Sequence, residues 1–329
     1  MKKLPVRLNG QGIFPLVALT IIIFSLSVRM ENVPPLGRLL NPFTGVVQNN
    51  GDRRLDGDLA IPATGVSEPV HVYFDDRKVP HIFAGNAGDL YFAQGYVTAS
   101  LRLWQMDFLS YASAGRLAEL FGDDYVAYDR NQRRIGMLSS ATRALSCIAK
   151  DKESWDALCA YTRGVNAYIR QLRYSQLPVE YKLLDYWPEN WTNLKTVLVM
   201  KYMAATLTGY EEDLSMSHLM LALGEEKFNR LFPSFQIHAT PVTGGGPSAA
   251  DSAYRCKRPD YLNYSFLSGG QIVAPSTYNP SLGSNSWAVS GEKTRSGYPI
   301  LANDPHLNLS LPSIWIEMQL SAPGLNVYG

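Results

Sequence analysis

The spacing of hydrophobic residues changes along the chain, and each change predicts a different element. Residues 13–28, IFPLVALTIIIFSLSV, form an apolar run without any charge. Residues 70–76, VHVYFDD, alternate between apolar and polar positions, which predicts a strand. From residue 87 to residue 120 apolar side chains recur every three or four positions, as on one face of a helix. The helical spacing returns in residues 154–172, 193–208 and 211–223. We therefore expect a mostly helical first half that is entered through one strand.

The composition changes again between residues 233 and 283, where Gly, Pro, Ser and Thr dominate. Such a stretch is typical of a linker or an exposed loop. Alternation then resumes in residues 286–290 and 298–302 around the turn KTRSG, which predicts a β-hairpin that begins at Ser284. The resulting divisions are an N-terminal segment (1–30), a mostly helical region (31–232), a spacer (233–283) and a final hairpin region (284–329).

Composition narrows the classes of partner. Hydrophobic residues make up 46% and charged residues 18% of the 329 positions, which is enough apolar surface for a sizeable core. The net charge is +1, so there is no electrostatic argument for a nucleic-acid partner.

The N-terminus has the charge pattern of an export signal. Lys2, Lys3 and Arg7 precede the apolar run 13–28, and the positive end of such a segment stays in the cytoplasm. The run is longer than a typical signal core and slightly shorter than a comfortable span of about 20 residues. We expect an uncleaved membrane anchor, with a cleaved signal and a soluble periplasmic protein as the alternative. In both cases the rest of the chain works outside the cytoplasm.

The chain has three cysteines, Cys147, Cys159 and Cys256, and they indicate little about its function. Their odd number and the absence of CxxC spacing favour neither a zinc site nor a disulfide framework. A Cys147–Cys159 bridge is possible in an exported chain, but three separate thiols fit the pattern better.

The start of the hairpin holds the main candidate for catalysis. Ser284 follows Gly283 at the entrance to the predicted strand. Taken alone, a Gly-Ser pair is usually a plain turn. A serine hydroxyl needs a base before it can act as a nucleophile. A chain-terminal serine carries such a base in its own α-amine, which requires cleavage of the Gly283–Ser284 bond. His306, 22 residues later in LANDPHL, is the second candidate.

Two long segments resemble one family. Residues 283–307, GSNSWAVSGEKTRSGYPILANDPHL, resemble the start of the β-chain in the penicillin acylase family of N-terminal nucleophile hydrolases, which includes acyl-homoserine lactone acylases. Residues 70–107, which end in RLWQMD, resemble the opening of the family's α-chain. Lys78 and the pair Ser100-Leu101 depart from the family pattern, in which Gly and Gln-Asp are preferred. Both departures concern the scaffold and leave the nucleophile in place.

The resemblance implies an α+β protein with the four-layer αββα sandwich of these hydrolases and a largely helical α-chain region. It implies an amidohydrolase that cleaves a linear amide, namely a small N-acyl compound such as a penicillin or an acyl-homoserine lactone. Ser284 would cut the precursor at Gly283–Ser284 into an α/β heterodimer and then serve as the nucleophile, with its α-amine as general base. His306 would tune that amine or orient the hydroxyl. No organic cofactor is implied.

The same resemblance places the donors that stabilise the oxyanion beyond Gly329. The chain thus looks like a fragment that ends early in the β-chain, with only part of the sandwich present. It further implies that Asp213 binds a structural calcium ion and that Met203 and Leu207 line the acyl pocket. From the residues alone, an acid at a helix start is favoured by the helix dipole, and two apolar residues four apart are usually packed in a core.

Other motifs are weaker. Residues 290–293, SGEK, match S-x-x-K, but the pattern needs a helix and here it falls in a predicted turn. His71 and His81 are ten positions apart, too far on a strand to share a metal unless the chain folds back, so a structural role is expected for His81. The alternative to an enzyme is a non-catalytic, membrane-anchored binding or structural relative. The intact Gly283-Ser284 pair together with His306 favours the enzyme.

Overall fold

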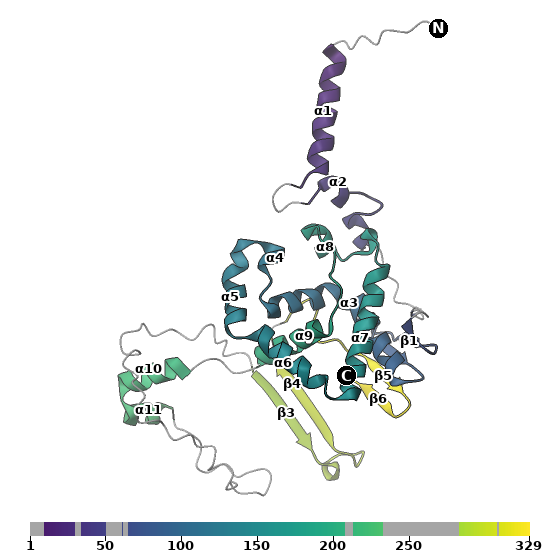
Figure 1. The fold of residues 1–329 in the computed structure, drawn as a ribbon. Coiled ribbons are helices and arrows are strands. Elements are labelled where there is room, and N and C mark those ends of the chain that lie inside the picture. The colour runs from purple at the N-terminus through teal and green to yellow at the C-terminus, as the bar shows by residue number, and fades with distance from the viewer. Residues whose placement is uncertain are drawn as a thin grey trace. The chain divides into compact units, whose positions relative to one another are not determined.

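The computed structural model describes residues 10–29, 34–50, 61, 65–207, 213–232, 283–307 and 309–329 (Figure 1). The chain divides into two compact units. The first unit comprises Met1–Leu207 and Leu309–Gly329, and the second comprises Thr208–Asn308. The predicted spacer falls almost entirely outside the described residues.

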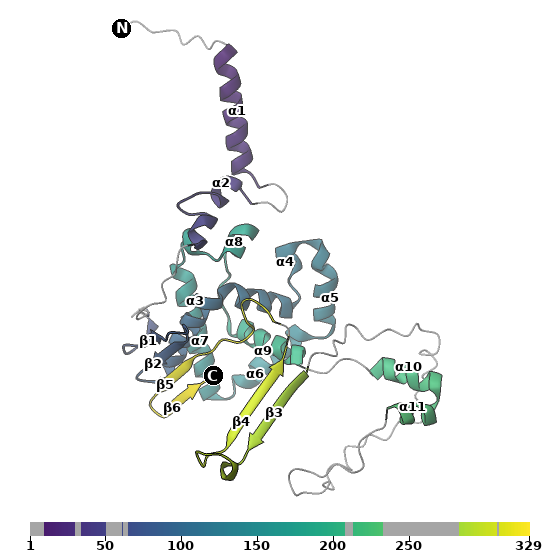
Figure 2. The same ribbon diagram turned by 180° about the vertical axis from the view of Figure 1, so that it is seen from behind.

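The first unit is organised around the long helix α3 (Ala87–Ala114). The side chain of Asn86 caps its start by accepting a hydrogen bond from the Asp89 backbone N–H. Helix α7 (Lys152–Gln171) lies alongside α3, as both views show (Figure 1, Figure 2). The approach is close, since a Cβ at Gly95 would lie 2.1 Å from the Tyr161 carbonyl oxygen. A small residue is therefore required where the two backbones meet.

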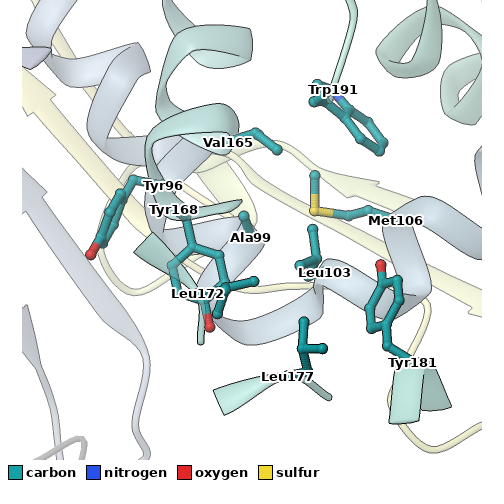
Figure 3. Close-up of a cluster of buried hydrophobic side chains, with 10 residues drawn as sticks. All are labelled: Tyr96, Ala99, Leu103, Met106, Val165, Tyr168, Leu172, Leu177, Tyr181 and Trp191. Atoms are coloured by element: carbon teal, nitrogen blue, oxygen red, sulfur yellow. The ribbon is translucent and has the colours of Figure 1, made fainter. Parts of the chain in front are cut away.

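The first unit contains further helices besides α3 and α7. They are α1 (Gly10–Ser27), α2 (Leu36–Leu39), α4 (Ala118–Phe121), α5 (Val126–Arg134), α6 (Met137–Ile148), α8 (Val179–Leu184) and α9 (Asn193–Leu207). One buried cluster joins α3 and α7 to the segment that follows them (Figure 3). Its members are Tyr96, Ala99, Leu103, Met106, Val165, Tyr168, Leu172, Leu177, Tyr181 and Trp191. The helical spacing of residues 87–120 and 154–172 thus reflects apolar side chains that are buried where α3 and α7 meet.

A four-stranded sheet completes the first unit. Its order is β1 (His71–Phe74), β2 (Pro80–Phe83), β5 (Gln319–Ala322) and β6 (Leu325–Tyr328). The β2–β5 pair is parallel, and the outer pairs are antiparallel. Strand β1 confirms the predicted strand. Strands β2, β5 and β6 were not predicted from hydrophobic spacing, because the alternating residues 70–76 end before them.

The second unit contains helices α10 (Asp213–Leu223) and α11 (Glu225–Leu231) and a separate hairpin. Strands β3 (Gly283–Val289) and β4 (Ile300–His306) pair over seven positions. The hairpin expected from the alternating pattern is confirmed, although β4 extends to His306. The SGEK motif lies in its connection, where Gly291–Lys293 form a single 3-10 turn.

The predicted membrane anchor is not supported. Among the helices that the structure describes, none is both long and apolar enough to cross a lipid bilayer. Helix α1 has 18 residues and begins with the sequence GQG. Export of the chain is a separate question and stays a prediction.

The described helices and strands together form a mixed α and β structure, with one four-stranded and one two-stranded sheet. This mixture agrees with the α+β class. The order of the four expected layers is not given by these sheets and stays a prediction.

Candidate active site

Ser284 lies at the start of β3, at the open end of the hairpin. Its register partner on β4 is Pro305, and the partner of Gly283 is His306. Ser284 is exposed, and the side chain of His306 is half-buried. Strand pairing therefore brings the two predicted catalytic residues to the same end of one element, although 22 positions separate them in the sequence.

The register also assigns side chains to the two faces of the hairpin. Directly opposite residues share a face, and successive residues alternate between faces. Ser284 and Pro305 thus share one face, while His306 projects from the other. The structure places His306 opposite the backbone of Gly283, next to the Gly283–Ser284 bond. It does not place the imidazole on the face that carries the Ser284 hydroxyl.

Polar side chains contact one another on both faces of the hairpin. Nε2 of His306 lies 2.7 Å from Oδ2 of Asp304, and the two side chains share a face because their positions differ by two. On the opposite face Oγ of Ser286 donates to Oδ1 of Asn303 at 2.7 Å. The Asp304 contact orients the imidazole ring along β4. Sequence reasoning did not single out Asp304, although it belongs to the quoted AND-P-H motif.

The two predicted acyl-pocket residues lie on α9, in the other unit. Met203 is half-buried, and Leu207, at the end of the helix, is 52% exposed. Both side chains lie one turn apart on the same face of the helix. Their part in substrate binding stays a prediction.

The predicted calcium ligand, Asp213, is the first residue of α10. Its side chain lies outside the described part of the chain. Within the described residues, no group of three or more His, Cys, Asp and Glu side chains could hold a metal ion. Binding of a calcium ion by Asp213 therefore stays a prediction.

The other histidines and cysteines fit structural roles. Nδ1 of His81 lies 2.6 Å from Oε1 of Gln319, and its Nε2 lies 3.6 Å from Oδ2 of Asp75. His71 lies on the edge strand β1, and its register partner is Phe83 on β2. Cys147 and Cys159 are both free thiols, so the possible bridge between them is not formed. Cys256 lies outside the described residues.

A buried charged cluster between α3 and α9 was not foreseen from the sequence. Asp107 is 1% exposed and accepts a hydrogen bond from Nζ of Lys195 at 2.8 Å. Tyr186 and Tyr181 donate to its other oxygen at 2.9 and 3.2 Å. Burial, reinforced by the charge of Asp107, raises the pKa of both tyrosines. These hydroxyls are therefore hydrogen-bond donors at neutral pH rather than bases.

Glu189 extends the cluster toward solvent. It accepts two hydrogen bonds from Arg116, at 2.8 and 3.3 Å, and lies 3.0 Å from Nζ of Lys195. The hydrogen bonds from Arg116 lower the pKa of Glu189 to about 2. The cluster ties α3 to α9 and has the features of a structural ion-pair network. Its members are scattered over distant parts of the sequence, so no local motif could have revealed it.

Comparisons with known proteins agree with the motifs. The family model described as penicillin amidase matches residues 69–329. The chain is 30% identical over 279 residues to the penicillin acylase 2 proenzyme of a Pseudomonas species (strain SE83), covering 84% of this chain and 34% of that protein. It is also 30% identical over 275 residues to the acyl-homoserine lactone acylase QuiP of Pseudomonas aeruginosa, covering 82% of this chain and 31% of that protein.

Among solved structures, the thermostable penicillin G acylase from Alcaligenes faecalis aligns with a TM-score of 0.46 and 30% sequence identity. The alignment covers 56% of this chain and 100% of the solved chain. The chain spans about a third of the length of the curated relatives that it matches.

Proposed function

The chain belongs to the penicillin amidase family, and from that premise we propose that the protein hydrolyses a linear amide through an acyl-enzyme on Ser284. The substrate class is a small N-acyl compound, of the kind named in its relatives, a penicillin or an acyl-homoserine lactone. One observation supports this function above others. An exposed serine that follows glycine begins a strand, and a histidine lies opposite that glycine.

The first step is self-cleavage of the precursor. Oγ of Ser284 attacks the carbonyl carbon of Gly283, and the peptide C–N bond breaks as the nitrogen takes up the hydroxyl proton. Water then hydrolyses the ester between Gly283 and Ser284. The products are a carboxylate on Gly283 and an N-terminal serine with a free amine and a free hydroxyl. The absence of a Cβ at Gly283 leaves its carbonyl open to this attack.

The second step uses the new terminus. The α-amine of Ser284 accepts the hydroxyl proton while Oγ attacks the carbonyl carbon of the substrate amide. The C–N bond breaks and the leaving amine carries away the proton, which leaves an acyl ester on Ser284. Water, activated by the same amine, hydrolyses this ester and releases the acid. Donors aimed at the developing oxyanion are needed in both halves of the reaction.

We assign His306 to the amine rather than to the hydroxyl. Its partner across the hairpin is Gly283, and its side chain leaves the face opposite to that of the Ser284 hydroxyl. Asp304 holds the ring in a fixed direction. An oriented imidazole beside the new terminus can hydrogen-bond to the amine and keep it in its proton-accepting form. No step of this mechanism uses calcium.

Substrate binding by Met203 and Leu207 is the least supported part of the proposal. Both are apolar, and Leu207 is accessible at the end of α9. Such side chains suit an aromatic or aliphatic acyl group, because burial of apolar surface drives binding of that half of the substrate.

The test is an assay of the full-length protein against a panel of N-acyl amides that includes penicillin G and acyl-homoserine lactones. Ser284→Ala should abolish turnover of every substrate. Ser286→Ala is the matched control, because it removes a hydroxyl from the same face of β3 two residues away. Turnover by Ser284→Ala would overturn the assignment. A wild-type protein that stays uncut and inactive on the whole panel would favour the non-catalytic relative.

A further inference from the structure

The RLWQMD segment of α3 carries two polar side chains that neither the mechanism nor the buried core uses. Met106 belongs to the core cluster and Asp107 to the charged cluster. Arg102 and Gln105 are both half-buried and lie three residues apart, so their side chains project from the same side of the helix. The helix is interrupted at Arg102, whose backbone has φ −138° and ψ 17°.

Both side chains donate to one backbone oxygen. Nε2 of Gln105 lies 3.0 Å from the carbonyl oxygen of Ser313, and Nη1 of Arg102 lies 3.4 Å from the same atom. A carbonyl oxygen has two lone pairs and can accept both hydrogen bonds. We call this arrangement the Ser313 clasp, formed by Arg102, Gln105 and the Ser313 carbonyl.

The clasp holds the start of a segment whose first described residues make no apolar contacts. Ser313 is exposed, and the side chains of Leu309 and Leu311 are fully exposed, so they contribute no apolar packing. Further along, Gln319 begins β5, which pairs with β2. The clasp therefore adds a fixed point ahead of Ile316 and Met318, which pack in the core, and ahead of β5.

The position of Ser313 in the sequence links the clasp to the reaction. Ser313 follows His306, the last residue of β4, by seven positions. Seven residues can reach at most about 25 Å. A fixed carbonyl at Ser313 thus limits the conformations open to the His306 end of the hairpin. Without the clasp, the chain would lose the fixed point at Ser313, and ordering the residues on its N-terminal side would cost more conformational entropy.

We propose that Arg102 and Gln105 are positioning residues for self-cleavage and hydrolysis, acting through the Ser313 carbonyl on the chain that leaves His306. This inference rests on the proposed function of Ser284. The two donors are partly redundant because they share one acceptor. Loss of one donor should therefore raise the activation free energy of self-cleavage by less than half as much as loss of both donors.

The test measures self-cleavage of full-length precursor made by cell-free synthesis, followed on denaturing gels over time. The double variant Arg102→Leu/Gln105→Leu should cleave about tenfold more slowly or worse, and each single variant about two- to threefold more slowly. Arg102→Lys should retain most of the wild-type rate, since lysine keeps a cationic donor. In all variants thermal unfolding identifies any general loss of stability.

Two matched controls remove the same kinds of hydrogen bond elsewhere. Gln48→Leu removes an amide donor to the Pro42 carbonyl, and Arg133→Leu removes a guanidinium donor to the Gly115 carbonyl. Both should cleave at the wild-type rate or be slowed only in proportion to lost stability. A clasp double variant that cleaves as fast as these controls would overturn the proposal.

A second measurement separates the clasp from the proposed function. Hydrogen exchange is followed in the uncut Ser284→Ala precursor, with and without the clasp substitutions. The clasp variants should exchange faster at backbone amides around residues 309–315, with α7 unchanged. Unchanged exchange there would refute the clasp whatever the cleavage result. If the clasp substitutions speed exchange in the Ser284→Ala precursor but the protein with Ser284 never cleaves itself, only the role of Ser284 is refuted.

Discussion

At the scale of single residues, the candidate site depends on how β3 and β4 are paired. Gly283 faces His306 across the hairpin, and Asp304 orients the imidazole from the same strand. A shift of one residue in this register would move every side chain to the opposite face. The bond proposed to be cut and the histidine proposed to assist are thus fixed relative to each other by backbone hydrogen bonds.

The buried Asp107–Lys195 pair gives a stability prediction. Lys195→Met should destabilise the protein by about 3 to 5 kcal/mol, because it leaves the charge of Asp107 buried without its partner. Replacing both residues, Asp107→Leu with Lys195→Met, should recover part of that loss. Urea unfolding followed by tryptophan fluorescence measures the differences. Lys152→Met, which removes a solvent-exposed pair with Asp156, is the control and should change little. An equal effect at the two lysines would contradict this account of the cluster.

Glu189 gives a prediction about pH. Its pKa is about 2 in the folded protein, below the ordinary value of 4.5, because Arg116 donates hydrogen bonds to its charged form. A lowered folded pKa means stabilisation that is present above 4.5 and lost as the pH falls toward 2. The stability difference between wild type and Glu189→Gln should therefore be constant above about pH 5 and narrow below it. Urea midpoints across a pH series measure this difference. A stability difference that stays constant down to the lowest pH at which the protein folds would refute the lowered pKa of Glu189.

At the scale of elements, α3 organises the first unit and its end is sharply defined. Gly115 ends the helix with φ 66°, in the left-handed region. A Cβ at this position would also lie 2.6 Å from the carbonyl oxygen of Asp129. Both the conformation and the contact therefore favour glycine.

Gly115→Ala should consequently cost more stability than the same change at Gly136. Gly136 also has a positive φ, of 79°, but a Cβ there would meet nothing within 4 Å. The left-handed conformation alone costs about 1 to 2 kcal/mol at each site, and the clash at Gly115 should add about 1 kcal/mol or more. Thermal or urea unfolding of the two variants gives the comparison. Equal losses would show that the Asp129 contact relaxes freely.

The elements that the sequence predicted are those with long, regular patterns. The helical spacing of residues 87–120 corresponds to α3 and α4, and the alternation after Ser284 corresponds to the β3–β4 hairpin. Strand β2 was not predicted from hydrophobic spacing, and its parallel pairing with β5 places His81 beside Gln319, 238 positions away. Local spacing cannot report such a contact.

In the candidate site, too, the local features were predicted and the contacts between distant residues were not. The motif around Ser284 and His306 is local and was found, whereas two other features were not. The Ser313 clasp joins α3 to a carbonyl more than 200 positions away, and the Asp107–Lys195 pair spans 88 positions. Both features arise from tertiary packing between distant residues, so no short stretch of the sequence could reveal them.

At the scale of the whole molecule, residues that follow the proposed cleavage site belong to both units. The hairpin lies in the second unit, while β5 and β6 complete the sheet of the first. Strand β5 pairs with β2, and the Ser313 clasp adds hydrogen bonds from α3. A cut at Gly283–Ser284 would therefore leave the two products joined by strand pairing and side-chain contacts, as an α/β heterodimer.

The central claim is that Ser284 cuts its own chain and then serves as the nucleophile. The most direct measurement is N-terminal sequencing and intact mass of the two chains in purified full-length protein, made in parallel with Ser284→Ala. We predict that one chain begins Ser-Asn-Ser-Trp, that both chains co-purify, and that Ser284→Ala remains a single uncut and inactive chain. An active wild-type protein whose Gly283–Ser284 bond is intact would contradict the account.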